Sequence, residues 1–251
     1  MSDIDDRVGN PEFWHLGSYE YPFYKSQFQS LFLSYTRKFF LILDAGCGPD
    51  GGYFTTVLKN IHGVGLDISR MNIEKSIKIS KKNGNNALSF VVGDIENMPF
   101  REDTFDLAIC QDVIEHIKDK EKAISDIAFS LKKGGKTLIS TTNAFNPAMF
   151  IDDILPKIVS EHIIRFFGGP QYYERNRRLN PWSLIKLLVN HRMIVRRLLL
   201  TGFPQIGQPW IYQYSNTKLP VIFYLWIVFN KLTDFPFFEN LKEIMLVAAE
   251  K

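Results

Sequence analysis

Four glycines stand in a short loop directly after an aliphatic run that ends at Asp44, in the stretch LILDAGCGPDGG. Glycine loses more backbone entropy on folding than other residues, so a cluster indicates that a turn, a helix or a ligand approaches the main chain. Gly46, Gly48 and Gly51 have G-x-G-x-x-G spacing, which lets backbone N–H groups and a helix N-terminus reach a ligand. Two glycines in a tight turn between a strand and a helix remain the simpler alternative.

Two carboxylates follow the next two apolar runs. Asp67 ends the run GVGLD about 20 residues after the loop, a spacing at which a carboxylate can accept the hydroxyls of a ribose. Asp94 follows the run ending in VVG, where it or the next backbone N–H could contact an adenine edge. The alternative role for Asp67 is a helix N-cap, but Ser69 is better placed for that role. The ends of three successive strands therefore provide backbone N–H groups, a carboxylate for a ribose and a carboxylate for an adenine.

The elements that must position these residues alternate between short apolar runs and segments of helical period. This alternation is typical of a parallel sheet covered by helices. The first half predicts strands at 40–44, 63–66, 88–92, 105–110 and 136–140, and helices at 53–60, 69–83 and 119–131. The second half predicts a helix at 182–190 and strands at 193–200 and 243–249, interrupted by proline-rich segments. Before the first strand, Phe28, Phe32 and Tyr35 are spaced to share one helix face.

Composition excludes several classes of protein. The chain has 251 residues with 45% apolar content, so it can bury a core of its own. Its net charge of +3 is too small to indicate a nucleic-acid partner, and DNA is not expected. Cys47 and Cys110 form no C-x-x-C pair, so neither a zinc site nor a disulfide framework is indicated. An acidic N-terminus and the lack of a long apolar run lead us to expect a cytoplasmic protein.

Taken together, the motifs resemble those of class I S-adenosylmethionine-dependent methyltransferases. The resemblance rests on LDAGCGPDGG, GLDIS, GDIENMPF, FDLAICQDVIEHI and LKKGGKTLIST, between Phe39 and Thr142. It implies a Rossmann-like α/β fold with a seven-stranded, mostly parallel sheet and helices on both faces. Family loops commonly read G-x-G-x-G, whereas Pro49 and Asp50 separate the glycines here, so the roles of Gly51 and its neighbour are open.

The resemblance also assigns residues to the amino acid end of S-adenosylmethionine. Gly46 and Gly48 are expected to lie against the methionine part of the cofactor. Asp44 is expected to order the loop or to reach the cofactor's ammonium group through water. Gln111 follows the fourth strand, where the family approaches the same amino acid end.

A second set of residues is assigned to the nucleoside by the same resemblance. Asp67 is expected to hold the ribose, and Ile68 to pack on the adenine. Asp94 is expected to take the adenine amino group, while Ile95 offers a backbone N–H.

His116 is the candidate catalytic residue. Methyl transfer requires alignment of a nucleophile and exclusion of water, with a base only where the acceptor needs deprotonation. The tripeptide Glu115-His116-Ile117 is expected to place the histidine one turn into the helix after the fourth strand. There it could be a base or an acceptor contact, or it could support the loop by hydrogen bonding, and the sequence favours neither role.

Aromatic segments suggest what the acceptor is. We expect one domain over 1–251, in which a helical cap (1–39) and two inserted lid segments (144–180 and 202–240) flank the cofactor-binding core (40–143) and the last strand (241–251). The aromatic-rich lid predicts a small lipophilic or amphipathic acceptor, as in the ubiquinone and menaquinone branch that the chain resembles. The run VIFYLWIVF at 221–229 is either buried in the lid or, with nearby arginines, a peripheral contact with a membrane.

Other functions remain as alternatives. An RNA methyltransferase would use the arginines between Arg165 and Arg197, and a binding module would keep the fold without turnover. A nicotinamide-dependent dehydrogenase would share the glycine loop and Asp67, but it gives no reason for Asp94. The oligomeric state is not indicated.

Overall fold

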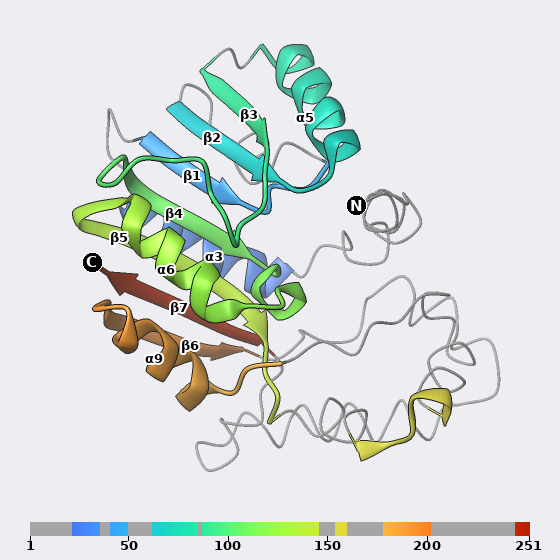
Figure 1. The fold of residues 1–251 in the computed structure, drawn as a ribbon, viewed down its shortest axis with the longest axis vertical. Helices are drawn as coiled ribbons and strands as arrows, with labels where there is room; N and C mark the ends of the chain where they lie inside the picture. The colour runs from blue at the N-terminus through green and yellow to red at the C-terminus, as the bar shows by residue number, and fades with distance from the viewer. Residues whose placement is uncertain are drawn as a thin grey trace.

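Seven strands form a single sheet in the computed structural model, which describes residues 22–35, 41–49, 62–84, 87–145, 154–159, 178–201 and 244–251 (Figure 1). The order across the sheet is β3-β2-β1-β4-β5-β7-β6. The strands are β1 (Leu41–Ala45), β2 (His62–Asp67), β3 (Leu88–Val92), β4 (Phe105–Gln111), β5 (Leu131–Thr142), β6 (Ile194–Thr201) and β7 (Ile244–Glu250).

The first five strands are parallel, and β7 runs antiparallel to both β5 and β6. The carboxyl ends of β1 to β5 therefore lie along one edge of the sheet. Chain order reverses between β1 and β4, which pair through Asp44 opposite Ile109. In open α/β sheets, ligands bind outside the carboxyl ends of the strands at such a reversal point. The topology thus directs attention to the residues that follow β1 and β4.

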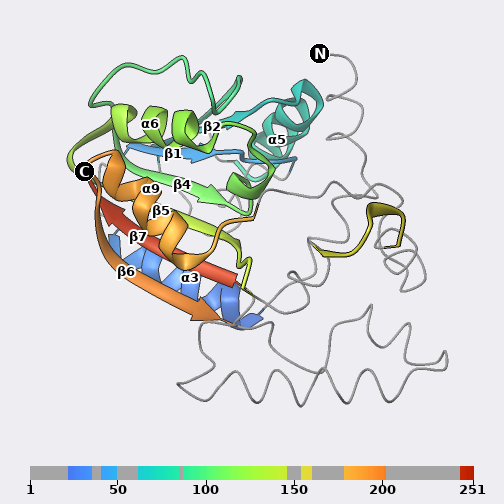
Figure 2. The ribbon, with the colours of Figure 1, turned by 60° about the horizontal axis from the view of Figure 1, so that its bottom comes forward.

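Helices cover both faces of the sheet. Helix α3 (Pro22–Tyr35) packs Phe28 and Phe32 on one face, whereas α6 (Lys120–Ser130) and α9 (Pro181–Asn190) pack on the other (Figure 2). Because successive strand side chains point to opposite faces, Ile42 joins the core under α3 while Leu43 joins the core under α6 and α9. A further helix, α5 (Arg70–Lys82), connects β2 to β3.

Polar side chains fix where the helices begin. Ser69 caps α5 by accepting a hydrogen bond from the N–H of Asn72, at 3.3 Å. Asp119 accepts in the same way from Lys122 N–H at the start of α6. Asn180 and Ser183 form a reciprocal capping box at α9, which also has proline in its first turn. These caps satisfy N–H groups that have no partner within the helix.

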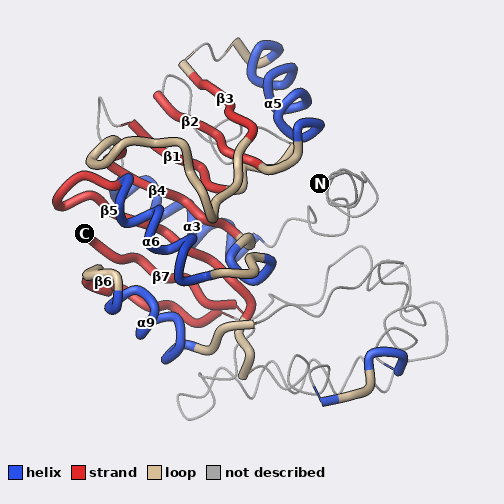
Figure 3. Tube along the Cα trace, viewed as in Figure 1, coloured by secondary structure: helices blue, strands red, loops and turns tan. Residues whose placement is uncertain are grey.

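Most expected elements are confirmed within one or two residues, and Figure 3 shows how the helices and strands are arranged. The buried pair Phe28 and Phe32 confirms the expected face of α3. One strand is longer than expected, because β5 begins at Leu131, opposite Phe105, before a register irregularity that precedes Leu107. The expected helix at 53–60 and the run at 221–229 lie outside the described residues.

The expectation for the segment after β4 is wrong in one respect. His116 ends a short 3₁₀ turn, η1 (Ile114–His116), and does not belong to the following helix. Ile117 is extended, and the cap at Asp119 starts α6 as a separate element. Among the described helices, none is long and apolar enough to cross a membrane.

Candidate active site

The turn after β1 has a backbone that favours glycine at two positions. Gly46 and Gly48 have φ angles of 90° and 65°, in the left-handed region that other residues rarely adopt. The N–H groups of Gly46 and Cys47 both donate to the carbonyl of Leu66, at 2.8 and 3.0 Å, which ties the turn to the end of β2. A side chain on Gly46 would overlap the methyl groups of Val113, so the turn after β4 packs directly against this glycine.

The backbone of Gly48 makes hydrogen bonds, whereas the position that a side chain would occupy is not filled by the described residues. Its N–H donates to Asp67 Oδ2 at 2.9 Å, and its carbonyl accepts from Ser76 Oγ at 2.8 Å. An added Cβ would meet no heavy atom of the residues that the structure describes within 4 Å. The result is a rigid backbone with space beside it, next to a carboxylate, and this arrangement fits the cofactor that the sequence implies.

Asp67 organises the end of β2. The residue is 7% exposed, and its carboxylate accepts hydrogen bonds from Gly48 N–H, from Ser69 N–H at 2.9 Å and from Asn72 Nδ2 at 3.2 Å. Asp67 therefore orders both the glycine turn and the start of α5. A carboxylate has about four acceptor positions, so a ribose hydroxyl would share an oxygen with these donors or take the place of Gly48 N–H.

The residues expected at the nucleoside lie at neighbouring strand ends. Ile68 is 44% exposed although it directly follows the buried end of β2, and its contact with the adenine stays a prediction. After β3, Asp94 accepts from the N–H of Glu96 at 2.8 Å, while the Ile95 side chain is buried. Gly93 N–H donates to the carbonyl of Asp67 at 2.9 Å, so the two strand ends are joined.

The turn after β4 contains a strained residue that the sequence did not reveal. Asp112 is exposed and has a φ of 53°, which is uncommon outside glycine. Its N–H donates to the carbonyl and hydroxyl oxygens of Ser140, and the Ser140 hydroxyl donates to Asp112 Oδ1 at 2.9 Å. Ser140 lies opposite Gln111 on β5 and is fully buried. The Asp112 carboxylate is therefore held at the carboxyl end of β4 and β5.

Glu115 binds β5 three residues further along the same turn. It is 4% exposed and accepts a hydrogen bond from Thr141 Oγ1 at 2.9 Å. Burial raises the pKa of this carboxyl, although hydrogen bonds from Thr141 and Thr142 and the charge of Lys120 oppose the shift. Ser140 and Thr141 are consecutive strand residues whose side chains point to opposite faces. The turn after β4 therefore makes hydrogen bonds to side chains on both faces of β5.

His116 and Gln111 flank this strained turn. His116 is exposed, and its N–H donates to the carbonyl of Val113 at 2.9 Å. Gln111 is partly buried at the end of β4. Since Val113 packs on Gly46, the chain brings both residues to the same edge of the sheet as the glycine turn. The catalytic role of His116 and the cofactor role of Gln111 stay predictions.

Both cysteines lie in acidic surroundings. Burial raises the pKa of the Cys47 thiol, and the charges of Asp44 and Asp67 raise it further. Burial also raises the pKa of Cys110, with contributions from Glu115, Asp44 and Asp112. The thiolate is the nucleophilic form of cysteine, so neither thiol is suited to nucleophilic catalysis. The same carboxylates favour a cationic ligand, and the sulfonium of S-adenosylmethionine is a cation.

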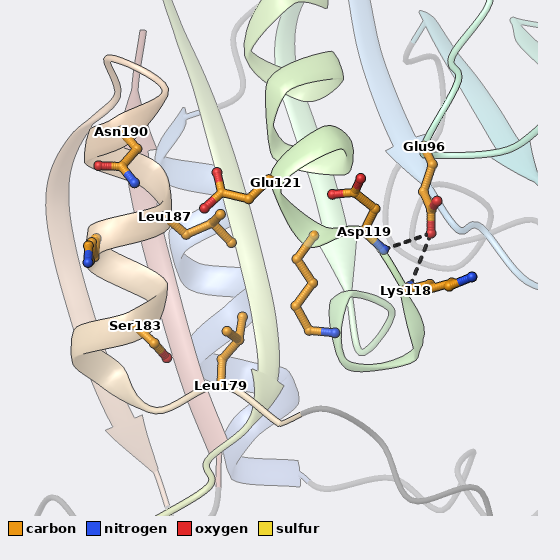
Figure 4. Close-up of a pocket in the computed structure, with 10 residues that line it drawn as sticks. Glu96, Lys118, Asp119, Glu121, Leu179, Ser183, Leu187 and Asn190 are labelled. Carbon is orange, nitrogen blue, oxygen red and sulfur yellow. Dashed lines mark hydrogen bonds between the residues drawn. The ribbon is translucent and has the colours of Figure 1, made fainter.

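A groove of about 740 Å³ lies between α6 and α9 (Figure 4). Leu179 and Leu187 contribute apolar surface, and charged residues come mainly from the segment 118–121. The Glu96 carboxylate accepts from the N–H groups of Lys118 and Asp119, at 3.0 and 3.1 Å, which joins the loop after β3 to the start of α6. None of the expected cofactor residues lines this groove, so it is distinct from the site at the glycine turn.

Comparison with known sequences agrees with this geometry. A profile for a methyltransferase domain matches residues 40–165, which is half of the chain. An uncharacterised protein of Methanocaldococcus jannaschii is 35% identical over 107 residues, covering 43% of each chain. A ubiquinone biosynthesis O-methyltransferase of Rickettsia conorii is 28% identical over 159 residues, covering 62% of this chain and 52% of the relative. The chain spans about half the length of these curated relatives.

Comparison with solved structures shows the same fold. A geranyl diphosphate C-methyltransferase from Streptomyces coelicolor, solved with S-adenosyl-L-homocysteine, superposes with a TM-score of 0.59 at 14% identity, covering 90% of this chain and 79% of that one. The Rossmann-like, seven-stranded sheet expected from the sequence is therefore confirmed. With half of its length matched by the family profile, the chain belongs to the class I S-adenosylmethionine-dependent methyltransferases.

Proposed function

We propose that this chain transfers a methyl group from S-adenosylmethionine to a small apolar or amphipathic acceptor. When bound, the cofactor supplies a methyl group that its sulfonium has already activated. The protein must then hold the cofactor, align the acceptor and exclude water. The open side of Gly48, beside Asp67 and the half-exposed Ile68, supports the cofactor part of this proposal.

In the proposed complex, two groups of residues hold the cofactor. Asp44, Gly46, Gly48 and Gln111 would serve its amino acid end, because all four lie where chain order reverses between β1 and β4.

Asp67, Ile68, Asp94 and Ile95 would serve the nucleoside, because they follow β2 and β3 at the same edge. In the part of the chain that the structure describes, no hydrogen bond from the Ile95 N–H is found, which is consistent with a donor to the adenine.

One observation supports the proposal that the methyl acceptor is apolar. Phe145 and Trp182 form an edge-to-face pair with ring centroids 5.0 Å apart, and Trp182 is 65% exposed. The pair stands just beyond β5, where Asn143 bridges to Leu179, and so lies past the carboxyl edge that carries the site. Large exposed aromatic surface at such a place favours contact with an apolar ligand. The Rickettsia relative, named for ubiquinone biosynthesis, supports an acceptor of this class.

His116 is proposed to contact the acceptor or to act as its base. It is exposed beyond the turn that packs on Gly46, on the side of the site away from Asp67 and Asp94. Imidazole is the side chain whose ordinary proton affinity best suits general base catalysis near neutral pH.

The test uses S-adenosylmethionine labelled in its methyl group, with cell extract divided into an organic-solvent fraction and an RNA fraction. We expect label in the organic-soluble molecules. Label in RNA would establish the RNA alternative, and bound cofactor without any transfer would establish a binding module. Trp182→Ala should reduce transfer to apolar molecules, whereas Val189→Ala, a change at an exposed position near the other end of α9, should not.

A further inference from the structure

Helix α5 has a row of polar side chains on its buried face. Asn72, Ser76 and Ser80 follow one another at a spacing of four residues, and each is 3% exposed or less. Residues four apart lie on the same face of a helix, and a buried face is usually apolar. Burying polar groups costs free energy unless hydrogen bonds compensate for it. The row is therefore explained by what its side chains bind rather than by packing alone.

Two members of this row contact residues that the sequence assigns to the cofactor. The Asn72 amide donates from Nδ2 to Asp67 Oδ1 at 3.2 Å. Ser76 Oγ, one turn further along α5, donates to the Gly48 carbonyl at 2.8 Å. Gly48 N–H in turn donates to Asp67 Oδ2 at 2.9 Å. The helix therefore supports the carboxylate expected at the ribose and the glycine turn through two separate side chains.

The orientation of the Asn72 amide leaves one of its atoms without a partner. Nδ2 faces Asp67, whereas Oδ1 is buried and accepts no hydrogen bond from the residues that the structure describes. A rotated amide would place Oδ1 against the Asp67 carboxylate, so the donor must face that group. A buried acceptor without a donor costs free energy, and such atoms in native proteins call for an explanation. The hydrogen bond to Asp67 supplies that explanation.

We propose that Asn72 is a positioning residue that orients the Asp67 carboxylate for the ribose of the cofactor. Ser69 N–H and Asn72 Nδ2 both donate to Oδ1, so together they fix the rotation of the carboxylate about its side-chain bond. Hydrogen bonds to a charged acceptor depend on such geometry. Ser76 has a different role, because it holds the backbone of Gly48. This inference rests on the proposed function, since it requires S-adenosylmethionine at this site.

The ribose hydroxyl groups provide the test. Calorimetry compares the affinity of S-adenosylhomocysteine with the affinities of its analogues that lack the 2′ or the 3′ hydroxyl. The wild-type protein should bind at least one analogue about tenfold or more weakly than S-adenosylhomocysteine, because a hydrogen bond to a charged acceptor is lost. Asn72→Leu has a side chain of similar branched shape, and it removes the donor and the buried acceptor together. We expect this variant to reduce the ratio of the two affinities to about threefold or less.

Two further variants separate the positioning role from a general loss of binding. Ser76→Ala should weaken the binding of S-adenosylhomocysteine and of both analogues by about the same factor, because it releases Gly48 and leaves the amide bond to Asp67 in place. Glu74→Gln, at an exposed position on the same helix, should change neither the affinities nor their ratio.

The stability of the variants shows whether they are folded. Asn72→Leu should unfold at close to the wild-type urea concentration, because the Asp67 carboxylate keeps the N–H donors of Ser69 and Gly48. Asn72→Ala, which cannot be too large for the site, should show the same reduced ratio. An unchanged ratio in a folded Asn72 variant would overturn the proposal, as would a wild-type protein that binds both analogues as tightly as S-adenosylhomocysteine. Failure of the wild-type protein to bind S-adenosylhomocysteine would instead contradict the proposed function, so the two failures are distinguishable.

Discussion

Replacing Gly46 or Gly48 by alanine tests two properties of the glycine turn separately, its packing against the turn after β4 and the space proposed for the cofactor. Both residues have positive φ, so each substitution carries a conformational cost of about 1–2 kcal/mol. At Gly46 the new methyl group would also overlap the side chain of Val113. At Gly48 it would meet no atom of the described part of the chain. One change therefore disturbs packing between the turns after β1 and β4, and the other occupies the space proposed for the cofactor.

The magnitudes follow from this difference. Overpacking in a close-packed interior costs about 1–3 kcal/mol in addition to the backbone term. We therefore expect Gly46→Ala to lower the free energy of unfolding by about 1–3 kcal/mol more than Gly48→Ala does. Gly48→Ala should instead weaken the binding of S-adenosylhomocysteine, because its methyl group would stand where the ligand approaches the backbone.

The assay pairs urea denaturation with calorimetric titration of S-adenosylhomocysteine for both variants. Equal losses of stability would show that Val113 does not pack on Gly46 as described. Unchanged cofactor affinity in Gly48→Ala would refute the assignment of the open space beside Gly48 to the cofactor.

Four further changes have defined outcomes. Asp67→Asn should lower cofactor affinity by about 1.5–3 kcal/mol in calorimetry, because one oxygen of a charged acceptor is lost, and unchanged affinity in a folded variant would reject the ribose role. Glu115→Gln should flatten the pH dependence of the free energy of unfolding, measured with urea. Because the pKa of Glu115 is raised in the folded state, the stability of the wild-type protein falls as pH rises from the ordinary pKa of 4.5 to the folded-state pKa. An equally steep fall in the variant would contradict the buried position of Glu115. His116→Ala should slow methyl transfer by about 100-fold with unchanged S-adenosylhomocysteine affinity, whereas wild-type turnover would leave only a structural role. The protein should float with anionic vesicles at low salt, and Trp226→Asp should weaken this, whereas failure to float under any condition would remove the peripheral membrane contact.

The sheet could be predicted because its determinants are local in the sequence. Buried parallel strands are short apolar runs, and Ser69 and Asp119 signal helix starts through their position alone. The strand ends that carry Asp44, Asp67 and Asp94 were consequently located within two residues.

The turn after β4 could not be predicted in the same way. The left-handed backbone of Asp112 depends on its hydrogen bonds to Ser140, a residue 28 positions away. The burial of Glu115 depends likewise on Thr141, because a glutamate within the run VIEHI gives no sign of a partner on β5. Contacts between distant residues decide both features, and a single sequence does not contain them.

Calorimetric titration of the purified protein with S-adenosylhomocysteine, and separately with NAD, tests the central claim most directly. The account predicts saturable binding of S-adenosylhomocysteine with micromolar-range affinity, because the glycine turn, Asp67 and Asp94 lie in order along the carboxyl edge of the sheet. It predicts no binding of NAD. Saturable binding of NAD with no response to S-adenosylhomocysteine would contradict it.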